Sequence, residues 1–364
     1  MANVVDQSLF EALPVLYQRW VGGWLPDGIP RERNATCADC AMCSDEPGEL
    51  TRDMGYYDRS LKCCTYFPDL PNFLAGRALA GDNPGAAALR AFVDDGADRH
   101  GQANLRVIHP SAKFVTIYDR HHKEGFGRDP KLLCPYAIER DAPEGPRCGI
   151  WQYRNSVCST FFCKHVKGQT GFQFWQTMRG LLSALEWSLS WWVIAEVLPD
   201  PARAFRAGAV NASDRNGLTL HPDAWRHWPG TRTEFYAACA DRVEALSPDE
   251  AIAIAGVDAK LYAMELQVRY SALLDPEPPA RLRAAPFNVL QQTGARTTVQ
   301  ALTCSEPFEV PAALVPLLGR FQGAPTAETI EGIREATKVR LDPRLVRRLY
   351  DFGILEPVPD NASP

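Results

Sequence analysis

Several features that commonly assign a function are missing from this chain of 364 residues. It contains no G-x-x-x-x-G-K-[ST] phosphate-binding loop, no H-E-x-x-H zinc motif and no G-x-S-x-G nucleophile motif. The C-x3-C-x2-C motif of radical enzymes is also absent, because the cysteine run that begins at Cys37 opens with a gap of two residues. None of these catalytic machineries is predicted, so the sequence leaves open whether the protein is an enzyme.

An excess of positive charge is lacking as well. The chain has 39 Lys and Arg residues against 44 Asp and Glu residues, which gives a net charge of −5. Proteins that bind phosphate backbones usually carry a basic surplus, so a nucleic-acid partner is not expected. The hydrophobic fraction of 46% and the charged fraction of 23% are those of an ordinary globular protein. They exclude a mainly disordered, collagenous or coiled-coil chain.

Neither an export signal nor a membrane span is recognisable. The first twenty residues carry Asp6 and Glu11 and lack a basic segment followed by an apolar run. The longest apolar stretch, Phe172 to Leu198, contains Arg179 and Glu186, which are costly at bilayer depth. We therefore expect a buried helix there, no membrane contact and a cytoplasmic location. In a reducing cytosol, clustered thiols are more often metal ligands or redox groups than disulfides.

Cysteine is the residue that the chain concentrates. Nine of its 11 cysteines fall in one stretch: Cys37, Cys40, Cys43, Cys63, Cys64, Cys134, Cys148, Cys158 and Cys163. The first three form a C-x2-C-x2-C run, whose short gaps let three thiolates converge on one centre. A fourth ligand must come from elsewhere. The pair Cys63 and Cys64 is one source, and Cys134 is another, because Pro135 follows it as proline often follows the remote ligand of ferredoxin-type clusters.

The last three of the nine cysteines form a second limb with aromatic neighbours that could shield a centre from water. We predict that all nine cysteines are candidate metal ligands, enough for two centres with one spare or for one larger cluster. Four thiolates suit zinc and iron–sulfur clusters alike. The ferredoxin-like run and the aromatic neighbours favour an iron–sulfur cluster of the 4Fe–4S type. Zinc is the alternative cofactor, and structural disulfides are a third interpretation of the cysteines. The isolated Cys239 and Cys304 are expected to pack in the core.

The second limb carries a family resemblance. The segment C-G-I-W-Q-Y-R-N-S-V-C-S-T-F-F-C, residues 148–163, resembles the YkgJ-like cysteine-cluster family, whose pattern is C-x-I-Y-x-x-R-P-x-x-C-R-x-F-x-C. The matching positions are Cys148, Ile150, Arg154, Cys158, Phe161 and Cys163. The departures from the pattern are Trp151 for tyrosine, Asn155 for proline and Ser159 for arginine. The upstream run also resembles the opening motif of that family, although Ser44 stands where a fourth cysteine usually follows.

The resemblance extends over residues 37–163, about a third of the chain. It implies a zinc- or iron-chelating domain, possible iron–sulfur ligation and no settled reaction. A more distant similarity is to flagellin lysine N-methylases, which carry a cysteine-rich metal region in a chain of comparable length. That similarity implies a transferase that methylates lysine.

The pattern outside the cysteines predicts an α+β fold that is mostly α-helical. An irregular cysteine-rich half contains small strands, at Leu105–Ile108 and Lys113–Tyr118, and leads into a core helix over Phe172–Leu198, where apolar residues repeat at three and four positions. Further helices are expected between Thr231 and Leu274. The D-P-E-P-P segment at Asp275–Pro279 cannot continue a helix and predicts a linker, so we expect domains at 1–274 and 284–364.

The tail predicts a small domain of its own. We expect a strand at Thr297–Leu302, a helix at Pro311–Phe321 and a turn at Gly323–Pro325. A second helix follows at Thr326–Ala336, and a last helix begins at Asp342. This order resembles the PqqD-like winged helices, which implies recognition of a protein or peptide partner.

The sequence thus supports two main functional hypotheses. The first is an iron–sulfur or zinc cysteine-cluster protein with a redox or protein-maturation role, whose C-terminal region recognises a partner. The second is an adaptor in which structural zinc holds the fold and the tail binds a peptide or protein. The lysine N-methylase-like transferase is a third, implied by resemblance alone.

Overall fold

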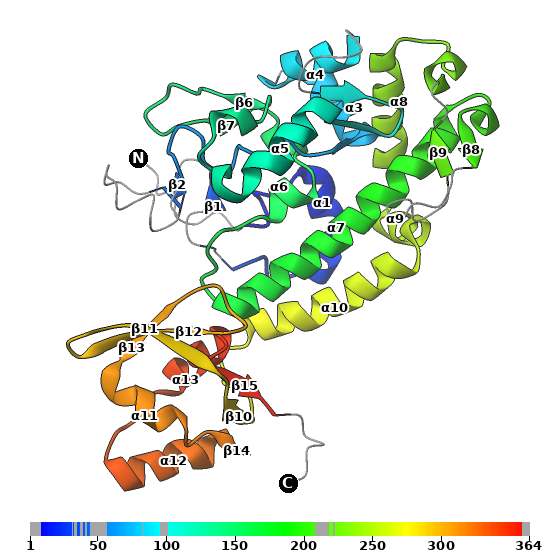
Figure 1. The fold of residues 1–364 in the computed structure, drawn as a ribbon. Helices are drawn as coiled ribbons and strands as arrows, with labels where there is room; N and C mark the ends of the chain where they lie inside the picture. Colours follow the sequence, from blue (N-terminus) through cyan, green and yellow to red (C-terminus); the bar gives the residue numbers. More distant parts are fainter. Residues whose placement is uncertain are drawn as a thin grey trace, which may run out of the picture. The chain divides into compact units, whose positions relative to one another are not determined.

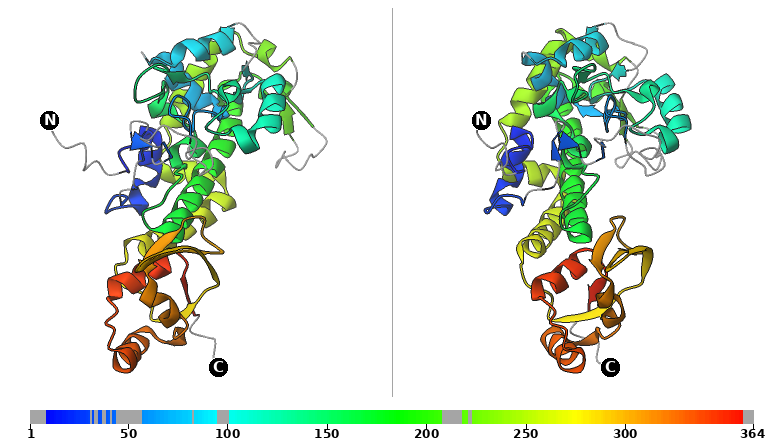
Figure 2. Two further views of the ribbon diagram at one scale, coloured as in Figure 1. Left: turned by 60° about the vertical axis from the view of Figure 1, so that its left-hand side comes forward. Right: turned by 90° about the vertical axis from the view of Figure 1, so that its left-hand side faces the viewer.

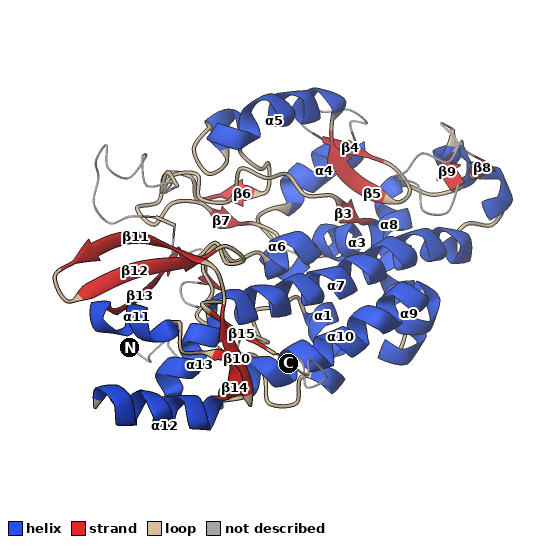
Figure 3. Cartoon of the chain, turned by 60° about the horizontal axis from the view of Figure 1, so that its bottom comes forward, coloured by secondary structure: helices blue, strands red, loops and turns tan. Residues whose placement is uncertain are grey.

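The structure is a computed structural model and describes residues 9–30, 32, 35–36, 39–40, 42–43, 57–81, 83–94, 101–207, 218–220 and 223–358. The chain forms two compact units (Figure 1). The first contains Met1–Ile29, Asn34–Phe161 and Met178–Met264, and the second contains Pro30–Arg33, Phe162–Thr177 and Glu265–Pro364. The second unit is thus wider than the domain that we expected at 284–364. The fold is α+β and mostly helical, as predicted, with 51% helix and small antiparallel sheets (Figure 3).

Helices are the main regular elements of the first unit. They are α1 (Val15–Val21), α3 (Asn72–Ala80), α4 (Ala86–Asp94), α5 (Ala112–Gly125), α6 (Ser156–Thr160), α8 (Arg232–Glu244) and α9 (Pro248–Ala255). Two longer helices, α7 (Gly168–Val197) and α10 (Val257–Leu274), contribute residues to both units. Single 3-10 turns lie at Gly22–Trp24, Pro130–Leu132, Trp151–Tyr153, Pro201–Arg203 and Ala224–His227.

The strands of the first unit are short and pair antiparallel. One sheet has the order β3 (Leu70–Pro71), β5 (Val107–Pro110), β4 (Gly101–Ala103). The other strands form the pairs β1 (Ala35–Thr36) with β2 (Asp39–Cys40), β6 (Ala137–Ile138) with β7 (Arg147–Cys148), and β8 (Phe205–Ala207) with β9 (Leu218–Leu220). The predicted strand at 105–108 corresponds to β5, displaced by two residues.

The predicted core helix is α7. Leu181, Leu185 and Leu189 are completely buried, which is the pattern that their spacing of four predicts. α7 lies side by side with α10 (Figures 1 and 2), and at the Gly180 position an added Cβ would clash with the ring of Tyr262. Glycine therefore lets the two helices approach closely. Among the described residues, no helix combines the length and the apolar character that crossing a bilayer requires.

Helix α3 packs on α8 through an equally close approach. A Cβ at Gly76 would overlap the carbonyl oxygen of Tyr236 and crowd the side chain of Ala240. Because these are backbone and short side-chain atoms, they cannot swing aside. We expect Gly76→Ala to lower the free energy of unfolding by about 1–3 kcal/mol, the usual range for overpacking. Urea denaturation followed by circular dichroism measures it, with Gly332→Ala as the control, because Gly332 is also a helical glycine but has open space where a Cβ would lie.

The second unit has its own core. Its strands form two antiparallel sheets, one with the order β14 (Gln322–Pro325), β10 (Arg281–Ala284), β15 (Leu355–Pro357), and one with the order β11 (Phe287–Thr293), β12 (Arg296–Ala301), β13 (Phe308–Pro311). Its helices are α11 (Val315–Leu318), preceded by a 3-10 turn at Ala312–Leu314, α12 (Thr326–Thr337) and α13 (Pro343–Asp351). The core includes Leu282, Val299, Leu318, Ile333, Val346 and Leu355.

Two local predictions were wrong. Lys113–Tyr118, predicted as a strand, lies in α5, because the hydroxyl of Ser111 accepts from the backbone N–H of Phe114 and caps the helix. Gly323–Pro325, predicted as a turn, belongs to β14, which pairs with β10. The partners of β14 are distant in sequence, so no local signal could reveal the pairing.

Candidate metal centre

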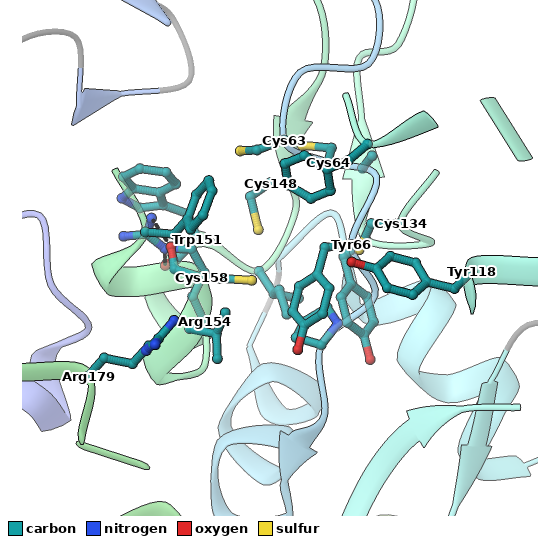
Figure 4. Close-up of a pocket in the computed structure, with 17 residues that line it drawn as sticks. Cys63, Cys64, Tyr66, Tyr118, Cys134, Cys148, Trp151, Arg154, Cys158 and Arg179 are labelled. Atoms are coloured by element: carbon teal, nitrogen blue, oxygen red, sulfur yellow. Dashed lines mark hydrogen bonds between the residues drawn. The ribbon is translucent and has the colours of Figure 1, made fainter. Parts of the chain in front are cut away.

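Five of the predicted cysteine ligands line one pocket in the first unit. They are Cys63, Cys64, Cys134, Cys148 and Cys158 (Figure 4). The cavity has a volume of about 370 Å³. Its cysteines come from four separate segments of the chain, so the fold gathers thiols that are up to 95 residues apart in sequence.

Backbone hydrogen bonds join the segments that carry the first four of these cysteines. The N–H of Cys64 donates to the carbonyl of Leu61 at 3.1 Å in a tight turn, and the N–H of Cys134 donates to the carbonyl of Cys64 at 2.6 Å. Cys148 pairs with Ala137 in the β6–β7 ladder, and the N–H of Ala137 donates to the carbonyl of Cys134. The positions of these cysteines are therefore set by the main chain.

Cys158 lies in the short helix α6. The side-chain oxygen of Asn155 accepts from the N–H of Cys158 at 3.0 Å and so caps this helix. The carbonyl of Cys158 accepts from Arg154, whose guanidinium also donates to the carbonyls of Trp151 and Ala12. The same guanidinium stacks on the indole of Trp151, with its carbon 3.3 Å from the ring centroid. Arg154, a position that matches the family pattern, thus fixes the segment that carries Cys158.

The C-x2-C-x2-C run is described only in part. Cys37 lies outside the described residues. Cys40 and Cys43 form a turn in which the N–H of Cys43 donates to the carbonyl of Cys40 at 3.1 Å. A hydrogen bond from the Cys43 thiol lowers the pKa of Cys40 to about 6, against the opposing effect of burial. The lowered pKa favours the thiolate of Cys40, which is the form that binds metals.

Cys40 lies within electrostatic reach of the pocket. The pKa of Cys63 is lowered, chiefly by a hydrogen bond from the Cys64 thiol, while burial and the charge of Cys40 act in the opposite direction. The charge on Cys40 reaches Cys63 only if the two sulfurs are close. The early run and the pocket cysteines therefore belong to one neighbourhood.

The negative charges of the pocket thiolates repel one another. Burial raises the pKa of Cys158, and the charges of Cys134, Cys148 and Cys63 raise it further, while Arg154 lowers it. Cys134 is raised in the same way, first by burial and then by Cys148 and Cys63. A group of thiols whose negative charges oppose one another is stabilised by a cation, because bound metal favours the thiolate form.

The described residues do not form a finished ligand sphere. No group of three or more His, Cys, Asp or Glu side chains within the described ranges has the geometry to hold a metal ion. Cys163 is half-buried, belongs to the second unit and does not line the pocket. Cys239 and Cys304 are buried, 0% and 4% exposed, which confirms their prediction as core residues.

Sequence reasoning missed a buried carboxylate beside the site. Glu186, on α7, is fully buried and accepts hydrogen bonds from the hydroxyl of Tyr17 and from both the N–H and the hydroxyl of Ser156, the latter two at 2.7 and 2.5 Å. Ser156 is the first residue of α6, so Glu186 fixes the start of the helix that carries Cys158. The only sequence signal was an acidic residue near the middle of a mostly apolar stretch.

Comparison with protein-family models, with curated proteins and with solved structures finds no match to this chain. The assignment of function therefore depends on the site itself.

Proposed function

We propose that the protein is a metalloprotein that binds an iron–sulfur cluster through the cysteines of this pocket and uses it as a redox centre. The observation that supports the proposal is the convergence of Cys63, Cys64, Cys134, Cys148 and Cys158 on one cavity. Isolated structural cysteines have no reason to gather from four segments, whereas ligands of one cofactor must.

The donor chemistry of the pocket fits such a cofactor. Thiolates are the ligands of iron–sulfur clusters, and two of the neighbouring cysteines, Cys40 and Cys63, have lowered pKa values. Since no three described side chains already surround one point, the cysteine side chains must rotate inward to bind metal. When bound, the cluster would supply a redox couple, and this chain would supply the thiolates, the aromatic walls and the charge of Arg154.

The cavity favours a cluster over a structural zinc ion. Structural zinc is enclosed by four ligands and leaves no space beside it. Here the cysteines line a cavity of about 370 Å³ together with aromatic side chains such as Tyr66, Phe126 and Phe161. An apolar shell of this kind limits solvent access and tunes the reduction potential of a cluster. Recognition of a protein or peptide partner by the C-terminal region stays a prediction from the sequence.

Anaerobic purification with parallel assays of iron, sulfide and zinc tests the proposal. We expect iron and sulfide in comparable amounts and a visible absorption that bleaches on reduction. Zinc alone in a colourless protein would rule out the cluster and support the zinc adaptor. Absence of all three from freshly purified protein, and after anaerobic reconstitution with iron and sulfide, would rule out both.

Cysteine variants locate the centre. Cys134→Ala, Cys148→Ala and Cys158→Ala are each expected to lower the iron content at least fivefold, because each removes a ligand candidate of the same cavity. Cys239→Ala is the matched control, a buried cysteine of the first unit that does not line the pocket, and it should keep its iron. Equal iron contents in all four variants would show that the metal binds elsewhere.

A further inference from the structure

Much of the pocket wall is not cysteine. Aromatic side chains line it, among them Tyr66, Tyr118, Phe126, Tyr136 and Phe161. The rings of Tyr66 and Tyr118 meet edge to face with their centroids 6.0 Å apart, and Phe126 and Phe161 do the same at the same distance. A mostly apolar cavity of about 370 Å³ with a few polar groups is typical of a site for a small organic molecule.

The polar lining of the pocket includes arginine. The pocket has two, and their surroundings differ: Arg154 donates to three backbone carbonyls and stacks on Trp151. Arg179, on α7, is half-buried and lines the pocket, yet it makes no hydrogen bond or ion pair with any residue that the structure describes. In Figure 4 its side chain extends toward the end of the pocket that holds Trp151 and Cys158. A half-buried guanidinium without a partner attracts an anion.

We propose that this pocket binds a small aromatic monocarboxylate. Its carboxylate pairs with Arg179, and its ring lies against the aromatic wall. A phosphate fits less well, because phosphate sites gather several cationic or backbone donors, whereas Arg179 is the one lining arginine here without a partner among the described residues. Nearby thiolates add negative charge that disfavours a dianion further. The inference rests on the proposed function, since the ligand would lie beside the proposed metal cofactor.

Binding of 4-hydroxybenzoate to the full-length protein, measured by titration calorimetry and saturation-transfer NMR, tests the proposal. We expect 4-hydroxybenzoate to bind at least tenfold more tightly than the neutral 4-hydroxybenzyl alcohol and than phenyl phosphate. Equal affinity for the acid and the alcohol would overturn the proposal, and tighter binding of phenyl phosphate would replace a carboxylate with a phosphate.

Two substitutions assign the contacts. Arg179→Gln is expected to weaken 4-hydroxybenzoate binding at least tenfold and to abolish the preference over the alcohol. Arg203→Gln is the matched control, because Arg203 is exposed and does not line the pocket. Unchanged affinity in Arg179→Gln, with circular dichroism showing an intact fold, would contradict the role of Arg179.

The proposals of a metal centre and of a carboxylate ligand can be refuted separately. The titrations are run on the protein as purified and after removal of metal with a chelator under reducing conditions. Iron without 4-hydroxybenzoate binding would refute the ligand and leave the metal centre standing. Binding that depends on Arg179, in a protein that holds no iron or zinc as purified and takes up none on reconstitution, would support the ligand and refute the metal centre.

Discussion

Glu186→Ala is expected to lower the free energy of unfolding of the first unit by about 3–6 kcal/mol. The substitution leaves the hydroxyl of Tyr17 and the N–H of Ser156 buried without an acceptor, and each unpaired group costs about 1–3 kcal/mol in addition to the cavity. The start of α6 loses its anchor, so Cys158 should also be displaced. Chemical denaturation gives the stability, and the iron content reports on Cys158.

Glu186 also makes stability depend on pH. Burial raises its pKa to about 7 from an ordinary value of 4.5, although its hydrogen bonds to Ser156 and Tyr17 act in the opposite direction. Between these two values the folded protein holds a proton that the unfolded chain has released, so stability falls as the pH rises from about 4.5 to 7. A shift of this size corresponds to about 3 kcal/mol.

Glu186→Gln isolates this effect. Glutamine keeps the shape and an acceptor but cannot ionise. Between pH 5 and pH 8 the free energy of unfolding of the variant should therefore fall by about 3 kcal/mol less than that of the wild type. Urea titrations of both proteins at several pH values measure the difference. Parallel pH profiles would show that another group is responsible.

The sequence predicted those features that local pattern controls. The spacing of apolar residues predicted α7, and helices were expected between Thr231 and Leu274, where α9 begins with a reciprocal capping box between Ser247 and Glu250. Asp342 likewise caps α13, and Gly353 takes positive φ after it, as a glycine at a helix end does.

Features that depend on distant contacts were not predictable. The β-branched residues at 115–117 favour a strand locally, but burial of Phe114 and the cap at Ser111 select a helix. In the site, the frame of Cys148 and Cys158 marked the pocket, whereas the role of Arg179 depends on what surrounds its side chain. A single arginine in a sequence does not reveal whether its partner is missing.

The second large loss of stability is expected from substitution of Arg154. Arg154→Ala is expected to destabilise the first unit by about 3–5 kcal/mol, because the carbonyls of Ala12, Trp151 and Cys158 lose a charged donor and the indole loses its stacked cation. Arg154→Lys should recover less than half of this loss. A lysine has a single ammonium group, which cannot span three carbonyls while stacking on a ring.

Arg203→Ala is the control for the loss of a guanidinium at the surface. Its side chain is 73% exposed and pairs with Asp200 at 2.9 Å, so the loss should stay below about 1 kcal/mol. Denaturation in urea, followed by tryptophan fluorescence and by iron content on the same samples, compares the three variants. If Arg154→Lys equals the wild type in both readouts, the three carbonyl contacts do not fix α6. If Arg154→Lys loses iron while its fold is retained, Arg154 positions the segment that carries Cys158. A positive charge alone would then be insufficient, and the several N–H donors of the guanidinium would be required.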